Sequence, residues 1–387
     1  MAQSQLRILH ALGTMDPGGV ETWLLHVLRS IGRDRFQFHF CTFGPQPGLY
    51  ASEVERLGGK MLRCPKGANL WSFRNRFQRI LREGNYDVVH SHVHLFSGAV
   101  LRWAKSEGVP IRIAHSHTTS DGKSNSSPRM FYRKLMRSWI HRYSTHGLAA
   151  SQPAAAELFG ENWQADTRVR VLYYGIDLEP FRQPINKEEI RGEFGIPLEA
   201  PVVGHVGRFV HPKHHAFILE IAAEILKMRP EIHFLLVGDG PLRPEIEARV
   251  KAIGLAENVH FSGLRTDVPR IMRGAMDVFL FPSLYEGFGL TVLEAQAAGL
   301  RCLVSDAVPH EIVVSPESVE FLPLSGGPDR WAKEAMKRLD APRLAAGVAL
   351  VQVARTPFSI QESIRNLASV YVSCKPVAMP LIVEEHA

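Results

Sequence analysis

Short runs of apolar residues alternate with amphipathic stretches along almost the whole chain. In the first half, the apolar run Leu6–Leu12 is followed by a glycine-containing loop and by residues 20–31, where apolar side chains recur at helical spacing. Apolar runs of this length are typical of buried strands, and the helical spacing indicates an amphipathic helix. Four further strands are predicted in this half, at residues 36–43, 88–92, 111–115 and 147–150.

The second half repeats the same alternation. Strands are predicted at residues 202–206, 233–237, 259–261, 278–281 and 301–304, and helices at residues 216–228, 243–253 and 290–298. Strands separated by helices favour parallel sheets that carry helices on both faces. Two such series predict an α/β protein with two doubly wound, Rossmann-like domains.

The first alternating series ends at a Tyr-Tyr-Gly turn, and a polar stretch precedes the second series. We therefore expect one domain in residues 1–175 and another in residues 176–356. Residues 357–387 would add a last amphipathic helix, at about residues 360–373, which is expected to pack back on the first domain. The Pro-bearing tail that follows this helix is expected to be mobile.

The composition fits a globular protein of two domains. The chain has 387 residues, of which 45% are hydrophobic and 22% charged, and this excludes disordered, collagen-like and coiled-coil classes. No stretch approaches the ~20 consecutive apolar residues of a membrane span, and the N-terminus lacks the hydrophobic region of a signal peptide. The four cysteines form no Cys-x-x-Cys pair, so we expect a cytoplasmic protein without a cysteine-based zinc site.

The net charge of +6 is unevenly distributed. Residues 1–170 carry 23 Lys and Arg against 12 Asp and Glu, whereas the remainder carries 22 against 27. A basic half predicts an anionic partner, such as nucleic acid, phospholipid or a phosphorylated substrate. A nucleic-acid-binding protein would interleave basic and aromatic residues on a known binding pattern. None is found, so we expect no nucleic-acid partner.

The densest candidate for chemistry is the segment 281–294, where a predicted strand ends, a glycine-bearing loop follows and a helix begins near Gly289. The free N–H groups of such a helix start form a site for anions. Glu286 and Glu294 frame it, and carboxylates beside a phosphate are expected to point toward sugar hydroxyls instead. The alternative is a tight turn followed by a helix with an acidic residue in its first turns.

Two cations follow the strand predicted at residues 202–206. Arg208 and Lys213 lie on the loop at the carboxyl edge of the second predicted sheet. At that position they can neutralise a diphosphate, Arg through two hydrogen bonds and Lys as a point charge. Solvation at the surface is the alternative. The turn Gly238-Asp239-Gly240 is a weaker signal of the same kind.

The histidines form a third group. His90, His92 and His94 recur at every second residue and would share one face of a strand, and His115 and His117 end another predicted strand. Their spacing makes a metal site conceivable. No HxxEH, Asp-x-His or cysteine cluster accompanies them, so we expect no metal. We expect one or two of them to hydrogen-bond a substrate in a cleft.

Taken together, these motifs resemble the retaining glycosyltransferases of family 4, which have the GT-B fold. The resemblance covers roughly residues 5–373 and is most specific in the second half, where residues 207–213, the Gly238–Gly240 turn and the Glu286/Glu294 pair stand in the order and spacing of the family. The segments 111–118, 280–287 and 294–299 are similar to the branch that builds capsular and exported bacterial polysaccharides.

The resemblance implies a nucleotide-sugar in the second domain and an acceptor mainly in the first. The implied catalytic residues are Arg208 and Lys213 at the diphosphate, Glu286 at the donor-sugar hydroxyls, and His92 near the anomeric region. Glu294 would hold the ribose. The other implied contacts are backbone groups and turns beside the substrates: Gly18, Gly19, Gly263, Leu264, Arg265, Phe288, Gly289 and Leu290.

The implied activity is retaining transfer from a UDP-sugar, with GDP-mannose left open, to a lipid-linked saccharide. No cofactor and no metal are expected, since fixed cations and a helix start can stabilise the leaving diphosphate. A phosphorylase and a nucleotide-sugar epimerase are alternatives with the same fold, and a histidine metallohydrolase is another enzyme class. The family more commonly has a pair of glycines in the segment before this glutamate. Residues 305–310 lack that pair, so the role of Glu311 is left open.

A basic helix is predicted at residues 129–142, and it concerns where a lipid-linked acceptor would be met. Phe131, Leu135 and Trp139 repeat at spacing four beside Arg133, Lys134 and Arg137. Such a helix can lie on an anionic membrane surface. The alternative is a solvated helix whose apolar stripe packs on the sheet. The polar residues 120–128 before it are expected to form a flexible excursion.

Overall fold

The structure is a computed structural model that describes residues 5–67, 69–120 and 126–372 of the chain. Its first half is a seven-stranded parallel sheet in the order β3-β2-β1-β4-β5-β6-β7. The strands are β1 Leu6–Leu12, β2 Phe36–Thr42, β3 Lys60–Arg63, β4 Val88–Ser91, β5 Ile111–Ser116, β6 His146–Ala149 and β7 Val169–Val171. The helices are α1 Gly19–Ser30, α2 Ala51–Arg56, α3 Leu70–Gly84, α4 Ser97–Ser106, α5 Ser127–Tyr143 and α6 Gln152–Phe159.

The second half is a six-stranded parallel sheet in the order β10-β9-β8-β11-β12-β13. Its strands are β8 Val202–Val206, β9 His233–Val237, β10 Val259–Gly263, β11 Val278–Phe281, β12 Arg301–Ser305 and β13 Val319–Leu322. Its helices are α7 Lys187–Gly192, α8 His215–Met228, α9 Arg243–Ala252, α10 Val268–Gly274, α11 Leu290–Ala297, α12 Gly327–Asp340 and α13 Ala346–Ala354. Two doubly wound α/β units are therefore present, which confirms the fold class predicted from the sequence.

The strand order of each sheet reverses once, between β1 and β4 in the first half and between β8 and β11 in the second. Open parallel sheets bind ligands at such switch points, outside the carboxyl ends of the strands. The segments that follow these four strands carry most of the residues predicted to be functional.

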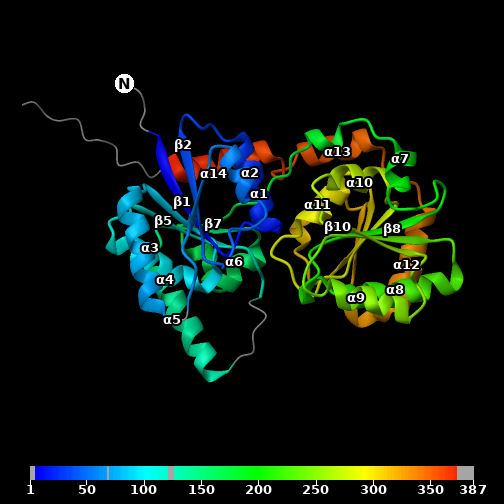
Figure 1. Ribbon diagram of the computed structural model, residues 1–387, viewed down its shortest axis with the longest axis horizontal. Helices are drawn as coiled ribbons and strands as arrows, with labels where there is room; N and C mark the ends of the chain where they lie inside the picture. The colour runs from blue at the N-terminus through cyan, green and yellow to red at the C-terminus, as the bar shows by residue number, and fades with distance from the viewer. Residues whose placement is uncertain (1–4, 68, 121–125, 373–387) are drawn as a thin grey trace, which may run out of the picture.

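The last described helix, α14 (Ile360–Val372), lies against the first half (Figure 1). The indole N–H of Trp23 donates to the hydroxyl of Ser363 at 2.9 Å, and that hydroxyl donates to the carbonyl of Tyr173. The two segments that cross between the halves also pair, because Ile176 exchanges backbone hydrogen bonds with Phe358 and Ile360. The proposed divisions after residues 175 and 356 fall at this double crossover.

Helix α5 differs from the continuous apolar stripe expected from the sequence. Phe131 is 70% exposed, whereas Leu135 and Trp139 pack against the core of the first half. Arg133 is 2.8 Å from a carboxylate oxygen of Glu157 on α6. The stripe is therefore split between the core and the surface, and part of the basic face is neutralised by a neighbouring helix.

Two expectations for mobile segments fall largely outside the described residues. The tail at 373–387 and residues 121–125 of the expected excursion are not among them. Pro128 belongs to the first turn of α5, so the end of that excursion is helical. In the described part of the chain, no helix is long and apolar enough to cross a membrane.

Candidate active site

A cavity of about 1150 Å³ lies between the two halves, at the carboxyl ends of their strands. The start of α1 and the residues around Tyr50 line it from the first half, and loops after β8, β9 and β10 together with α11 line it from the second. Eight of the residues predicted from the sequence line this cavity: Gly18, Gly19, Arg208, Lys213, Leu264, Arg265, Leu290 and Glu294. The other predicted site residues lie outside its lining.

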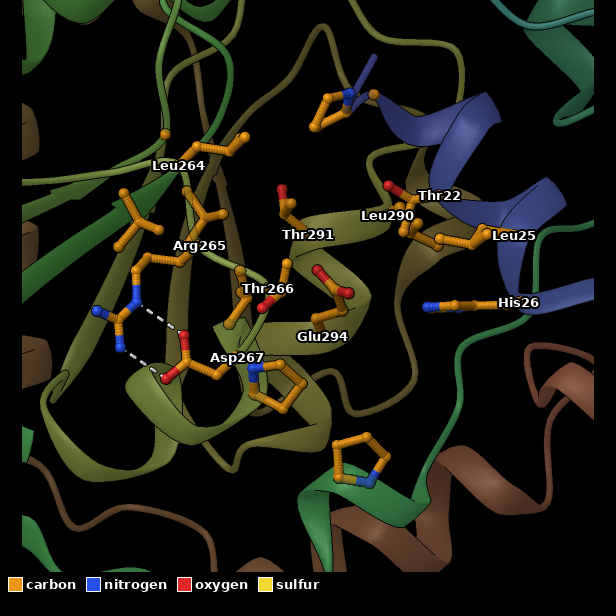
Figure 2. A pocket seen from close by; sticks show the side chains of 18 of the residues that line it. Thr22, Leu25, His26, Leu264, Arg265, Thr266, Asp267, Leu290, Thr291 and Glu294 are labelled. Carbon is orange, nitrogen blue, oxygen red and sulfur yellow. Dashed lines mark hydrogen bonds and ion pairs between the residues drawn. The ribbon is translucent and has the colours of Figure 1, made fainter. Parts of the chain in front are cut away.

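The start of α11 opens onto the cavity. Gly289 precedes the helix with a φ of 94°, a left-handed conformation that favours glycine and turns the chain sharply into α11. Figure 2 shows Leu290, Thr291 and Glu294 on this helix, opposite Thr22 and His26 on α1. The first backbone N–H groups of α11 and the positive end of its dipole are thus placed where an anion can bind.

The two cations lie on the loop after β8. The Lys213 ammonium is 2.5 Å from a carboxylate oxygen of Glu286 and lies 4.5 Å from the ring centre of Phe281. Both side chains of the ion pair are mostly buried, at 19% and 14% exposure. Arg208 lines the same cavity. The structure therefore places Arg208 and Lys213 on one cavity, and Glu286 is joined to this site through its ion pair with Lys213.

The loop that carries Glu286 is pressed against the first half. The hydroxyl of Thr119 donates to the Glu286 carbonyl at 3.0 Å, and the hydroxyl of Ser151 donates to the Gly287 carbonyl at 2.6 Å. A Cβ atom on Gly287 would lie 1.9 Å from the carbonyl oxygen of His117, so only glycine allows this approach. The glycine at 287 was not singled out from the sequence, because its contact comes from the other domain.

The side chain of Phe288 packs among other aromatic rings. Its ring is 2% exposed and lies 5.4 to 5.9 Å from the rings of Tyr173, Tyr174 and Phe358. Any contact of Phe288 with a substrate would therefore use its backbone, as the family resemblance implied.

Two carboxyl groups have raised pKa values: that of Glu294, which lines the cavity, and that of Glu21, which is next to the lining residue Thr22 on α1. Burial raises the pKa of Glu294 to about 7. The pKa of Glu21 is also raised to about 7, mainly by burial, while the positive charge of Arg208 opposes the rise. Sequence reasoning missed Glu21. The signal that could have found it is its place in the first turn of the helix that follows Gly18 and Gly19.

We expect Glu294→Gln to remove part of the pH dependence of stability. The folded protein holds a proton on Glu294 up to about pH 7, whereas the unfolded chain releases it near the ordinary value of 4.5. The stability contributed by the raised pKa is present below pH 4.5 and is lost as the pH rises through 7. The variant should therefore gain up to about 3 kcal/mol relative to the wild type between pH 5 and pH 8.

Urea unfolding of both proteins at the two pH values measures this difference. Glu220→Gln on α8 is the matched control, since the Glu220 side chain is 43% exposed. A Glu294→Gln difference that is equal at pH 5 and pH 8 would contradict the raised pKa.

The turn after β10 holds Arg265 away from Glu294. The Arg265 guanidinium pairs with Asp267 at 2.7 Å, as Figure 2 shows, and with Glu193 at 3.0 Å. These carboxylates raise the pKa of Arg265. Gly263 enters the turn with a φ of 70°. Since the charge of Arg265 is already neutralised, what this turn can offer a ligand is its backbone and apolar side-chain surface.

His92 is not among the residues that line the cavity. Its ring nitrogens lie 3.0 Å from Nδ1 of His10 and 2.8 Å from Nε2 of His117. The expectation that His94 shares a strand face with His90 and His92 is wrong. Strand β4 ends at Ser91, and His94 begins a short 3-10 helix with a φ of 47°.

Glu311, whose role was left open, bridges the halves. One of its carboxylate oxygens accepts a hydrogen bond from the backbone N–H of Gln152, at the start of α6, at 2.9 Å. It thus occupies a helix N-terminus in the first half, where a carboxylate is stabilised by the dipole.

Two Rossmann-like domains that face a cavity at their switch points define the GT-B class of fold. Residues 17–180 match the family model "Glycosyltransferase Family 4", and residues 186–346 match "Glycosyl transferases group 1". EpsF of Bacillus subtilis (strain 168), a protein named as a glycosyltransferase, is 32% identical over 375 residues, which cover 96% of this chain and 97% of EpsF. The chain belongs to this glycosyltransferase family.

Two further similarities extend the comparison. The UDP-Gal:α-D-GlcNAc-diphosphoundecaprenol α-1,3-galactosyltransferase of Escherichia coli is 30% identical over 252 residues, or 63% of this chain and 64% of that enzyme. The crystal structure of Anabaena HepE in complex with UDP superposes with a TM-score of 0.77 over 95% of this chain and 100% of HepE, at 20% identity. The second similarity concerns the fold alone.

Proposed function

We propose that this protein is a retaining glycosyltransferase that moves a sugar from a UDP-sugar to a lipid-linked saccharide, in the synthesis of a capsular, exported or related cell-surface glycan. The observation that carries the proposal is the interdomain cavity, which Arg208, Lys213 and the start of α11 line together with Glu294. The name of the E. coli relative contains a UDP-sugar and a diphosphoundecaprenol-linked acceptor, and HepE was crystallised in complex with UDP.

The diphosphate would lie between the two cations and the start of α11. When the anomeric C–O bond breaks, negative charge develops on the departing nucleotide, and fixed positive groups stabilise it without reorganisation. This arrangement requires no metal ion at the diphosphate. Lys213 is held in position by Glu286, whose carboxylate can also accept hydrogen bonds from the hydroxyls of the donor sugar.

We assign the nucleoside to one side of the diphosphate and the anomeric region of the donor sugar to the other. Glu294 would hold the ribose, and the turn Gly263–Arg265 would flank the base. His92 would border the anomeric region from the first half as a neutral ring, because burial lowers its pKa to about 3. The described site offers no evident nucleophile, so we favour attack on the donor from the face that the diphosphate leaves.

A donor panel tests the proposal. UDP-sugars and GDP-mannose should be compared by saturation-transfer NMR, and by nucleotide released with and without a lipid-linked saccharide. We expect binding of at least one UDP-sugar and release of UDP that depends on the acceptor. A phosphorylase would instead require inorganic phosphate, and an epimerase would interconvert two nucleotide-sugars without releasing nucleotide. Either result would overturn the assignment of transfer.

We also propose that the first half contacts an anionic membrane at its cytoplasmic face, where a lipid-linked acceptor would be presented. The first turns of α3 and α5 expose large apolar side chains, with Trp71 69% and Phe131 70% exposed. Apolar side chains beside basic ones are typical of interfacial binding.

Flotation with anionic liposomes measures this contact. We expect binding that weakens at high salt and falls in the double variant Phe131→Ser, Lys134→Gln. Leu264→Ser is the control, since Leu264 is 44% exposed but lies in the second half. Equal binding to neutral and anionic liposomes, unaffected by salt, would contradict the proposal.

A further inference from the structure

Five histidines converge at the carboxyl ends of three adjacent strands in the first half. His10 lies on β1, His90 on β4 and His115 on β5, while His92 and His117 directly follow the last two strands. His10 pairs with His90 across the β1–β4 ladder. His10, His90 and His115 are 0% exposed. A cluster of this kind needs a physical explanation, because imidazole rings are polar and burial in apolar surroundings is unfavourable unless their nitrogens are satisfied.

Three of these histidines face a common point. His92, His115 and His117 each offer a ring nitrogen, and the three nitrogens lie within 4.8 Å of one another. Nδ1 of His92 is 2.8 Å from Nε2 of His117, so these two rings point toward each other. Nε2 of His115 is buried and has no hydrogen-bond partner among the described residues. An unsatisfied, buried nitrogen beside two other imidazole nitrogens has the chemistry of a metal ligand.

The second nitrogen of each of these three rings is held by a neighbour. The three contacts are His92 Nε2 to His10 Nδ1 at 3.0 Å, His115 Nδ1 to His90 Nε2 at 3.0 Å, and His117 Nδ1 to the hydroxyl of Tyr174. Metal-ligating histidines are oriented in this way, because a bond to the other nitrogen fixes both the tautomer and the ring plane. Each of the three rings therefore offers one nitrogen to the common point and has its other nitrogen held by a neighbouring side chain.

We propose that His92, His115 and His117 form a three-histidine site for a divalent transition-metal ion of the zinc class. Imidazole ligands suit zinc, copper, nickel and iron ions, and three protein ligands leave a fourth position for water or another small ligand. The site shares His92 with the proposed function but uses neither Arg208 nor Lys213, so metal binding can be measured apart from glycosyl transfer.

From the sequence we expected no metal, since no HxxEH, Asp-x-His or cysteine cluster accompanies the histidines. The structure supplies the partners from a different strand, 25 residues further along the chain. The site also adjoins the loop that carries Glu286, because the carbonyl of His117 lies against Gly287. An ion bound here would fix the ends of β4 and β5 against that loop.

Titration of the EDTA-treated full chain with Co²⁺ tests the site. We expect one Co²⁺ bound per chain, with the visible absorption of a tetrahedral ion, displacement by Zn²⁺ and a rise in Tm on binding. Glycosyl transfer should persist in EDTA, which separates this site from the one proposed for the diphosphate. A wild-type protein that binds no stoichiometric Co²⁺ or Zn²⁺ would overturn the proposal.

Variants locate the ion. His115→Gln and His117→Gln should lose stoichiometric Co²⁺ binding, and Tyr174→Phe, which removes only an outer contact, should weaken it about 10- to 100-fold. His260→Gln is the matched control, because it removes one ring of an isolated pair with His233 at 2.9 Å and should leave binding unchanged. Undiminished Co²⁺ binding in folded Tyr174→Phe and His117→Gln proteins would exclude this cluster as the site.

Discussion

Replacing Lys213 with Ala is expected to lower kcat by about 10²- to 10³-fold, the loss typical of removing one preorganised group that stabilises developing charge. The ammonium of Lys213 is held at 2.5 Å from Glu286 and over the ring of Phe281, so it needs no reorganisation when the diphosphate leaves. Its side chain is only 19% exposed, which limits the screening of its charge by water. Steady-state kinetics with the donor and acceptor found in the panel measure the effect.

The variant must also remain folded for this result to be informative. Glu286 would lose its partner, and we expect a cost of about 1–2 kcal/mol in the free energy of unfolding, measured with urea. Lys227→Ala is the matched control, since Lys227 forms a surface ion pair with Glu224 and is 66% exposed. Its kcat should be that of the wild type. Normal turnover in both Lys213→Ala and Arg208→Ala would show that the diphosphate does not bind at these cations.

The fold could be predicted from the sequence wherever strands are buried on both faces. Strands such as β8 and β11 are fully buried and read as continuous apolar runs, so their positions were predicted to within a residue. Three strands were missed: β3 (Lys60–Arg63), β7 (Val169–Val171) and β13 (Val319–Leu322). All three lie at the edge of a sheet and contain exposed or half-exposed residues, so no continuous apolar run marks them.

The candidate site was predictable where one loop carries the chemistry and obscure where two domains meet. The positions of Arg208 and Lys213 could be predicted, because the strand and the loop that carry them are contiguous in sequence. The close contact of Gly287 with His117, and the bond between Gln152 and Glu311, join residues from different halves. No local pattern encodes such contacts, because they depend on how the two sheets face each other.

The histidines illustrate the same limit within one domain. Alternation predicted that His94 would share a strand with His90 and His92, but the strand ends at Ser91. What places the rings together is the order of β1, β4 and β5 in the sheet, which brings His10 beside His90. Strand order is set by the packing of the crossover helices as well as by the strands, so spacing along the chain was a poor guide to the cluster.

Glu286→Gln is expected to lower kcat by about 10²-fold, equivalent to the loss of one charge-assisted hydrogen bond to the sugar in the transition state. The substitution keeps the size of the side chain but removes the charge that orients Lys213. If Glu286 contacts the sugar and not the nucleotide, the Kd of UDP should change by no more than about threefold. The reason is that UDP lacks the sugar and binds through other residues.

Glu294→Gln provides the complementary control, since Glu294 lines the cavity on α11 and is assigned to the ribose. It should weaken UDP binding, whereas Glu286→Gln should spare it. A double variant of Lys213 and Glu286 completes the comparison: because the two side chains form one ion pair, their effects on kcat should be less than additive. If Glu286→Gln instead abolishes UDP binding and leaves kcat unchanged, Glu286 belongs to the nucleotide site. Strictly additive effects would mean that the ion pair does not act as a unit in the reaction.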